Sequence, residues 1–411
     1  MEFDIGKHTI FITLHGSHAY GMSRPESDVD IKGVAIPPKE YFHGFSKRFD
    51  QFQGDFPRDY LISNKTFNEK IEDMVGRKVP REEKIDSTIY DIRKFFQLAS
   101  NCNPNIIEIL YTKRDHHILT SDLWDIVLNS RDLFLSQKAK FTFSGYAFSQ
   151  LKRIKTHRNW LLSPIEKKPL RKDYGLPERS LISGDQRRAA EALIQRKIES
   201  WLYIPDELPK DVLNSIRRNT SDALLDMWEG LAADCYTKNE NGEFSLLSPP
   251  LNEFDDFDPI KLEHAASISL GFDSNFISAL DKERRYKCAL RNYTQYQEWK
   301  SNRNKIRAEM EKKHGFDCKH ASHLVRLLKM CNEIMILGKV IVARPDYKEL
   351  LDIRNGAWTY DYLIGWTEDK QRELDELYES RKSPLPKSPK INKINDLCIE
   401  VVEESFKSLG G

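Results

Sequence analysis

The chain has 411 residues, more than a single hydrophobic core usually serves, so we expect two domains. Lys and Arg (64) nearly balance Asp and Glu (63), so the net charge points neither to nucleic acid nor to an acidic partner. No apolar run reaches the ~20 residues of a membrane span, and the N-terminus carries acids where a signal peptide is basic, so we expect a cytoplasmic protein with no membrane partner.

The N-terminal part alternates short β-rich runs with helical patterns, which predicts an α/β head over residues 1–120. Asp91 is placed to cap a helix over 91–100, and Pro104 opens another. The polar stretch 48–84 is irregular, with an edge hairpin and a helix as candidates that we cannot place. The predicted strands and the turn or short helix between the first two cover residues 9–14, 18–27, 29–36 and 85–90.

From residue 121 onward the hydrophobic pattern follows a 3.6-residue period, which predicts a larger helical body over 121–411. Turn formers and acids over 239–259 predict a loop, and an insertion is expected around 200–300. The fold class expected is therefore α/β plus α, a mixed-sheet head joined to a larger helical body. The predicted helices lie near 121–135, 144–162, 185–203, 209–236, 281–313, 318–337, 346–354, 367–381 and 391–408.

Two acids flank a valine at the start of the second strand. Asp28 and Asp30 are two residues apart, so on a strand their side chains share one face. Two neighbouring carboxylates repel each other unless they share a cation. Oxygen ligands of this kind suit Mg²⁺ or Mn²⁺, which also take phosphate oxygens.

Gly16 and Ser17 follow the first predicted strand, where a helical segment would begin. Backbone N–H groups in such a turn, together with the Ser17 hydroxyl, can hold a phosphate. A short loop then brings a triphosphate beside the paired acids, which is the equipment for two-metal nucleotidyl transfer. Ser17 could instead be only a helix cap.

This Gly-Ser and Asp-x-Asp arrangement resembles the nucleotidyltransferase signature of the DNA polymerase beta superfamily. The string GSHAYGMSRPESDVDIKGVAIPP is similar to the branch described as the RNA repair pathway DNA polymerase beta family. The resemblance implies a polymerase-beta-like head, a divalent metal ion and an NTP substrate. Three further segments resemble that branch: STIYDIRKFFQLASNCNPNIIEILY, HASHLVRLLKMCNEIMILGKVIVARPD and LLDIRNGAWTYDYLIGW.

The resemblance also implies a third carboxylate on a neighbouring strand, which would bind the catalytic metal ion and deprotonate the attacking hydroxyl. Asp86 is our choice because it lies on the polar side of the third predicted strand. Asp91 is the rival, although a helix cap explains it well. Lys32 and Arg24 could balance phosphate charge, and either could be a surface cation.

Basic residues are concentrated between 138 and 172, where Glu166 is the sole acid. Cations give affinity for phosphate, and interleaved aromatic side chains can stack on bases, although we favour a core role for these aromatics. The tract predicts nucleic-acid contact, and the alternative is a solvated helix face. The residues chosen for that contact are Lys152, Arg153, Lys155 and Arg158.

A second basic stripe lies on the predicted helix that Asp317 would cap and Gly338 would end. Lys319, His323 and Arg326 share a face at spacing i, i+4, i+7. Relatives in the superfamily grip the nucleotide with a helical second domain, so the resemblance implies nucleotide binding here.

The stripe has two other interpretations. It could be an ordinary polar face with a satisfied histidine. Cys318, His320 and His323 also suggest zinc, but a single local cluster is weak support for a zinc site.

The sequence predicts a Mg²⁺- or Mn²⁺-dependent nucleotidyltransferase that transfers NMP from an NTP to a hydroxyl, with an RNA 3′ end as acceptor. Asp28, Asp30 and Asp86 would bind the metal ions, and Gly16, Ser17, Lys32 and the stripe on the late helix would bind the nucleotide. Two alternatives stay open: transfer of AMP to a protein hydroxyl, and an RNA-binding accessory protein with an inactive site.

Overall fold

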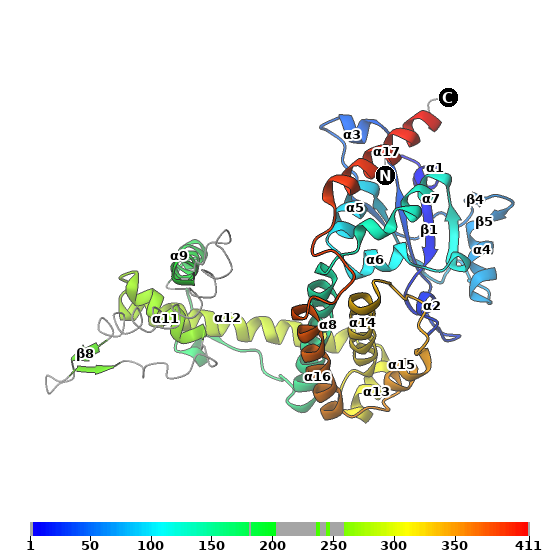
Figure 1. Ribbon diagram of the computed structural model, residues 1–411. Helices are drawn as coiled ribbons and strands as arrows, with labels where there is room; N and C mark the ends of the chain where they lie inside the picture. The colour runs from blue at the N-terminus through cyan, green and yellow to red at the C-terminus, as the bar shows by residue number, and fades with distance from the viewer. Residues whose placement is uncertain (1–2, 181, 203–235, 239–243, 247–258, 410–411) are drawn as a thin grey trace. The chain divides into compact units, whose positions relative to one another are not determined.

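The computed structural model describes residues 3–180, 182–202, 236–238, 244–246 and 259–409 (Figure 1). The chain divides into two units: a main unit, Met1–Pro164 with Arg303–Gly411, and a second unit, Ile165–Asn302. The main unit is therefore built from both ends of the sequence. The predicted helix over 209–236 lies outside the described residues.

A five-stranded mixed sheet forms the centre of the head, in the order β3-β6-β2-β1-β7. β1 runs antiparallel to β2 and β7, β3 runs antiparallel to β6, and β2 and β6 run parallel. The mixed sheet and the larger helical body confirm the predicted fold class. The strands are β1 Thr9–Leu14, β2 Asp30–Ala35, β3 Gln51–Gly54, β6 Asp86–Asp91 and β7 His117–Thr120, and a separate small ribbon pairs β4 Leu61–Ile62 with β5 Lys65–Thr66.

Both faces of the sheet are covered, which explains why every residue of β1 is buried. On one face, Phe11 stacks on Trp124 of α7 with ring centroids 4.3 Å apart. On the other face, Ile12 and Ile31 belong to a cluster that includes Ile71 of α4. The helices of the head are α1 Ile5–His8, α2 Gly16–Tyr20, α3 Glu40–His43, α4 Phe67–Val75, α5 Ile92–Ser100, α6 Pro104–Leu110 and α7 Asp122–Asn129, with the 3-10 turns η1 Arg114–His116 and η2 Arg131–Phe134.

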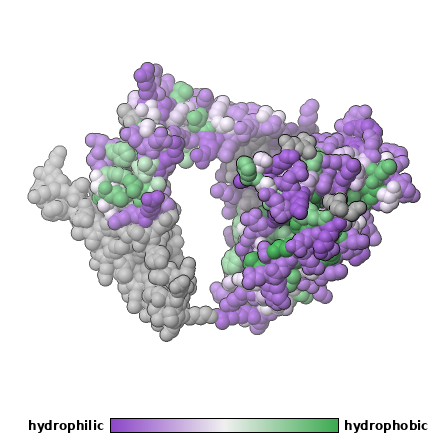
Figure 2. Space-filling view, turned by 90° about the horizontal axis from the view of Figure 1, so that it is seen from above, coloured by the Kyte–Doolittle hydropathy of each residue, from purple (hydrophilic) through white to green (hydrophobic). Residues whose placement is uncertain are grey.

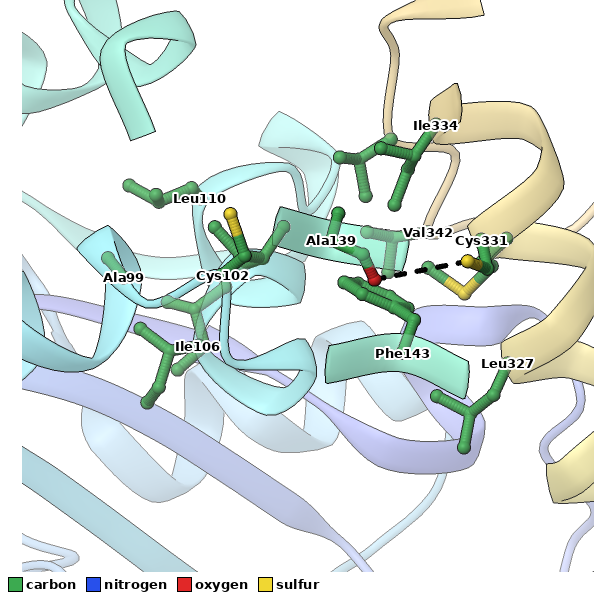
Figure 3. Packing of buried hydrophobic residues seen from close by; sticks show 14 of the residues in the cluster. Ala99, Cys102, Ile106, Leu110, Ala139, Phe143, Leu327, Cys331, Ile334 and Val342 are labelled. Atoms are coloured by element: carbon green, nitrogen blue, oxygen red, sulfur yellow. Dashed lines mark hydrogen bonds between the residues drawn. The ribbon is translucent and has the colours of Figure 1, made fainter. Parts of the chain in front are cut away.

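Helices α8 and α14 form the centre of the helical body. Phe143 of α8 is fully buried and lies beside Leu327 and Cys331 of α14 (Figure 3). The C-terminal helix α17 returns to the head and packs against α5 and α7 (Figure 1). These helices are α8 Lys138–Leu162, α13 Lys305–His314, α14 Cys318–Leu337, α15 Tyr347–Arg354, α16 Tyr360–Glu379 and α17 Ile391–Leu409.

The two helix caps predicted from the sequence are confirmed. The Asp317 carboxylate accepts the His320 backbone N–H at 3.0 Å, and Gly338 ends α14 in the left-handed conformation. The Asp91 carboxylate likewise accepts the Arg93 N–H at the start of α5. Each cap satisfies backbone groups that a helix end leaves unpaired.

Several elements differ from the prediction. The helix predicted over 144–162 begins at Lys138, the one over 367–381 begins at Tyr360, and the one over 121–135 is α7 followed by η2. The single helix expected over 281–313 is two helices, α12 Ser274–Ser301 and α13, because Asn302 ends the first and Asn304 caps the second. The loop expected over 239–259 contains strand β9 Phe244–Leu246, which pairs with β8 Tyr236–Lys238, and its last residue, Pro259, begins a helix. The rest of that loop lies outside the described residues.

The second unit has a small core of its own. Ala190, Ile194 and Leu280 are among its buried residues. Glu283, fully buried, pairs with Arg171 at 2.5 Å. Besides β8, β9 and α12, this unit contains η3 Arg171–Tyr174, α9 Gly184–Leu202 and α11 Pro259–Ser269.

Hydrophilic residues cover most of the main unit's face that is visible in Figure 2, and hydrophobic residues lie between them in smaller groups. Within the described part of the chain, no helix combines the length and the apolar character required to traverse a bilayer.

Replacing Phe143 should test the contact between α8 and α14. Phe143 is 0 % exposed, whereas Phe141 on the same helix is 52 % exposed. We expect Phe143→Ala to lower the free energy of unfolding by about 3–5 kcal/mol, because it leaves a cavity in the core. The matched variant Phe141→Ala should lower the free energy of unfolding by less than about 1.5 kcal/mol. Chemical denaturation monitored by circular dichroism would contradict this packing if the two variants lost equal stability.

Candidate active site

Three carboxylates gather where β2 and β6 begin. The parallel register places Asp30, the first residue of β2, directly beside Asp86, the first residue of β6. Asp28 lies two residues before Asp30, and Val29 between them is fully buried. Since paired residues in register share a face of the sheet, Asp30 and Asp86 project to the same side. The pattern read from the sequence thus corresponds to a local cluster of acids.

The electrostatics of Asp30 agree with this placement. Burial raises the pKa of Asp30, the Lys32 charge opposes the rise, and the Asp86 and Asp28 carboxylates add to it. The ion pairs found among the described residues include none of these three carboxylates. A cation bound between them would relieve their mutual repulsion, and an all-oxygen donor set fits Mg²⁺ or Mn²⁺.

Lys32 lies on the same face as the acids, one pleat further along β2. Its ammonium donates to the Thr88 hydroxyl at 2.9 Å, and the two residues are partners in the strand register. Lys32 therefore lowers the charge of the cluster without forming an ion pair to it. Its predicted contact with a nucleotide stays a prediction.

The turn after β1 approaches Asp30 closely. The His15 backbone N–H donates to the Asp30 carbonyl at 2.8 Å, and Gly16 has a φ of 60°. A Cβ added at Gly16 would lie 2.2 Å from Asp30 Oδ2, so only glycine fits this position. Ser17 follows at once in α2 with a half-buried side chain. The predicted phosphate-binding turn and the predicted metal-binding acids are thus in contact.

The two candidates for the third carboxylate occupy opposite ends of β6. Asp86 is exposed at the start of the strand, beside Asp30. Asp91 is paired with Ala35 in the register, is 1 % exposed, and binds the Arg93 guanidinium at 2.8 Å. The geometry therefore gives Asp91 a structural role and leaves Asp86 with the acids.

Four cations from the helical body and from the loop before β2 lie close to one another, and two of them, Lys319 and Arg354, also interact with the acids. We call these four residues the cationic group: Arg24, Arg307, Lys319 and Arg354. Partial burial lowers the pKa of Lys319, Arg354 and Arg307 lower it further, and Asp28 and Asp30 raise it. Burial and then Arg24 lower the pKa of Arg354, and Asp28 is again among the opposing charges. Clustered cations that depress each other's pKa form a site for an anion.

Two members of the cationic group have partners of their own. The Arg24 guanidinium donates to the Asn355 side-chain oxygen at 2.5 Å. The Arg307 guanidinium binds the Asp317 carboxylate, with Nε 3.0 Å from Oδ2. Arg307 was not among the residues that the sequence pattern selected, because it lies on a different helix from the basic stripe.

The basic stripe on α14 separates into an outer and an inner part. Lys319 reaches the surface although part of its side chain is surrounded by protein, whereas Arg326 is 2 % exposed and pairs with Glu108 of α6 at 2.5 Å. His323 Nδ1 lies 3.3 Å from Arg326 Nη2, and burial with the nearby Arg326 charge lowers the pKa of His323 to about 2. The predicted shared face is correct, but the inner cation already has a buried partner.

The predicted nucleic-acid contacts on α8 also separate by environment. Lys152, Arg153 and Lys155 are exposed. Arg158 is half-buried, donates to the Gly315 carbonyl at 2.8 Å and lies over the Tyr360 ring at 4.2 Å. Three of the four cations are therefore available to a partner, and Arg158 also joins α8 to later parts of the main unit.

The structure groups a different set of possible metal ligands from the zinc hypothesis. His157, Asp317 and His320 place ligand atoms within 4.8 Å of one another, whereas Cys318 and His323 are not in this group. Burial opposes the shift, but the His157 hydrogen bond and the nearby His320 and Arg307 hold the pKa of Asp317 well below its usual range. Because Arg307 already neutralises this carboxylate, the cluster gives no support to a zinc site.

Comparison with known proteins supports the family resemblance. The model of the RNA repair pathway DNA polymerase beta family matches residues 2–168, which confirms the resemblance over that range. An uncharacterized 38.9 kDa protein in the nrdC-mobD intergenic region of Enterobacteria phage T4 is 29 % identical over 145 residues, 34 % of this chain. The alignment covers 37 % of that relative's length. No solved structure gave a significant match.

The matched range includes all three carboxylates and the Gly16–Ser17 turn. The family described is a polymerase-beta-like nucleotidyltransferase family named for RNA repair. The two later segments that resemble the family, around α14 and α15, lie beyond residue 168. Their resemblance stays a prediction.

Replacing Gly16 should test the close approach of the turn to Asp30. We expect Gly16→Ala to lower the free energy of unfolding by about 1–3 kcal/mol, because alanine is strained at positive φ and its methyl group meets the Asp30 carboxylate. Gly145→Ala is the matched control, since nothing lies within 4 Å of its added Cβ in α8. Gly145→Ala should leave the free energy of unfolding unchanged or raise it by up to about 1 kcal/mol. Thermal and urea denaturation would contradict the geometry if both variants behaved alike.

Acidification should destabilise the fold through His15. Burial lowers the pKa of His15 from 6.5 to about 4, and Glu108 opposes this in part. The unfolded chain therefore binds a proton that the folded chain does not, and stability is lost as the pH falls from about 6.5 toward 4. His15 alone should contribute about 2 kcal/mol of this loss at pH 5. Urea denaturation at pH 7 and pH 5 should show a smaller loss for His15→Asn, and equal losses would refute the assignment.

Proposed function

We propose that this protein is a nucleotidyltransferase that uses Mg²⁺ or Mn²⁺ to transfer NMP from an NTP to the 3′ hydroxyl of an RNA. The observation that carries the proposal is the register of β2 and β6, which brings Asp30 beside Asp86 with Asp28 two residues away. The cationic group opposite these acids supports it, because an NTP brings a polyanion to the same place. The match of residues 2–168 to a polymerase-beta-like family gives independent support.

The three carboxylates would have different roles in the proposed reaction. Asp28 and Asp30 would hold the divalent ions, and Asp86 would complete the ligand set and accept the proton of the attacking hydroxyl. Divalent ions at such a site stabilise the charge that develops on the attacking and leaving oxygens during in-line displacement. The exposed position of Asp86 leaves it open to an acceptor hydroxyl.

The phosphates would lie between the turn and the cationic group. Gly16 and Ser17 offer backbone N–H groups and a hydroxyl for the β and γ phosphates. Lys319 and Arg354 offer charge from the opposite side, with Lys32 beside the acids. The acceptor oxygen forms a bond to the α-phosphorus, the α–β phosphoanhydride bond breaks, and pyrophosphate leaves with the electron pair.

The acceptor is proposed from charge and from the family description. Lys152, Arg153 and Lys155 form an exposed basic surface on α8, which we call the α8 basic surface. Exposed cations bind the phosphate backbone of nucleic acid without reading its sequence. A protein hydroxyl as acceptor would not require this surface, so the alternative of protein AMP transfer becomes an outcome of the test.

Replacing the acids should test the reaction. The purified chain is incubated with each radiolabelled NTP, Mg²⁺ or Mn²⁺, and a total RNA and protein extract, and label in each fraction is counted. We expect label in RNA from the wild type and a loss of about 10²–10⁴-fold for Asp30→Asn and Asp86→Asn. The surface variant Asp73→Asn is the control and should keep full activity. Label transfer that survives both replacements would sink the proposal.

The same assay separates the acceptors. The triple variant Lys152→Gln, Arg153→Gln, Lys155→Gln should lower RNA labelling, and its deficit relative to the wild type should shrink as the salt concentration rises, because fewer phosphate contacts give a shallower salt dependence. A control variant with the exposed Lys382, Lys387 and Lys390 all replaced by Gln should label RNA as the wild type does. Label found in protein and unaffected by the first triple variant would instead support protein AMP transfer. No label with any NTP, combined with RNA binding by the intact chain, would support the accessory alternative.

A further inference from the structure

Glu108 is a carboxylate in the centre of the main unit. It lies in α6 within the apolar run Ile106–Leu110, and it is fully buried. Its Oε1 accepts from the Arg326 guanidinium at 2.5 Å, and its Oε2 accepts from the Tyr20 hydroxyl at 2.6 Å. His15 Nε2 is 3.5 Å from the same Oε2. One buried acid therefore contacts three residues, two of them around the turn after β1 and one in α14, which is distant in the sequence.

Two of those residues flank the turn of the candidate active site. His15 directly precedes Gly16 and lies close to Glu108, and Tyr20 ends α2 and donates its hydroxyl to Glu108, so Glu108 holds the turn through Tyr20. The Tyr20 carbonyl also accepts the Arg344 backbone N–H at 3.1 Å. The third residue is Arg326 of α14, whose guanidinium also lies over the Tyr20 ring at 3.7 Å.

Arg326 also determines which way α14 faces. Lys319 and Arg326 are seven residues apart on this helix and share one side of it. Because Arg326 is bound to Glu108, the side of α14 that carries Lys319 is the side turned toward α6 and the turn after β1. The proximity of Lys319 to both acids in the electrostatics of the site agrees with this orientation.

Stability alone does not explain the pair. Desolvation of two buried charges offsets much of their attraction, and apolar side chains of similar volume often serve a core equally well. A buried pair that connects a catalytic turn to a substrate-binding helix can instead define their relative geometry. A displacement of about 1 Å at such a site costs roughly 100-fold in rate.

We propose that Glu108 and Arg326 are positioning residues, whose buried ion pair holds the Gly16–Ser17 turn and the first turns of α14 at the separation that an NTP triphosphate requires. Arg326 thereby acts on the nucleotide through Tyr20 and Lys319 instead of touching it. The inference rests on the proposed nucleotidyltransferase function for its kinetic part, and on the contacts of Glu108 for its structural part.

The test uses the full chain and a neutral replacement of the pair, Glu108→Gln with Arg326→Met, which leaves no buried charge without a partner. Arg171→Met with Glu283→Gln is the matched control, because it removes a buried ion pair from the second unit. Hydrogen–deuterium exchange is measured over residues 13–22 and 317–326, with the thermal unfolding midpoint as a separate readout. Steady-state KM for the NTP and kcat are measured in the labelling assay.

We expect the double variant to keep its unfolding midpoint within a few degrees, to exchange at least tenfold faster in both segments, and to show a KM for the NTP raised about tenfold with a smaller fall in kcat. The single variant Glu108→Gln should lower the unfolding midpoint more than the double variant does, because it leaves the buried Arg326 without its counter-ion. The control double variant should change neither the exchange rate of the two segments nor the KM for the NTP.

The outcomes separate this inference from the function it builds on. Unchanged exchange in both segments, or faster exchange spread over the whole main unit with a lowered midpoint, would overturn the positioning role. If the wild type labels no acceptor with any NTP, the function fails on its own, and the exchange data still decide whether the pair holds the two segments. A normal KM in a variant with faster local exchange would overturn the link to the nucleotide.

Discussion

The parallel pairing of β2 with β6 is the constraint on which the candidate site depends. These strands are 50 residues or more apart in the sequence, yet their register sets the distance between Asp30 and Asp86. A slip by one residue would turn one of the acids to the opposite face and remove the shared ligand set. Gly16 adds a second constraint, because any larger residue would collide with the Asp30 carboxylate.

The site consists of a group of acids and a group of cations. Within each group the like charges repel one another unless an oppositely charged partner binds. Burial raises the pKa of Asp30 and the neighbouring acids add to the rise, whereas burial lowers the pKa of Lys319 and Arg354 and the other cations of the group add to the fall. Neither set is neutralised by direct contact with the other among the described residues. Metal ions on one side and phosphates on the other would satisfy both, and preformed charge of this kind is what electrostatic catalysis requires.

Local features were predictable from the sequence, and long-range partners were not. The bounds of β1 and α14, the Asp317 cap and the Gly338 terminus follow from hydrophobic periodicity and capping chemistry, and all are found. The Asp86 position followed from the polar side of a predicted strand. Which strand lies beside β2 depends on tertiary pairing, so no local pattern identifies Asp86 as the register partner of Asp30.

Arg326 shows most clearly which contacts cannot be predicted from the sequence. Helical spacing correctly put it on the face of Lys319, but its partner Glu108 is more than 200 residues away along the chain. The one local sign was a single acid inside the apolar run of α6, an unusual position that calls for a partner. The division of 281–313 into two helices was missed because the Asn302–Asn304 break interrupts the helix by only a few residues.

The main unit is assembled from the first 164 residues and the last 109, since it comprises Met1–Pro164 and Arg303–Gly411. Helices α14 and α17 close the core that the sheet, α5 and α8 leave open. During synthesis, the segment that carries the acids therefore emerges from the ribosome long before the helices that cover it. Until α14 and α17 have been synthesised, the nascent chain must keep its apolar faces from associating with other chains, so the part that carries the acids should complete its folding only after these later helices have emerged.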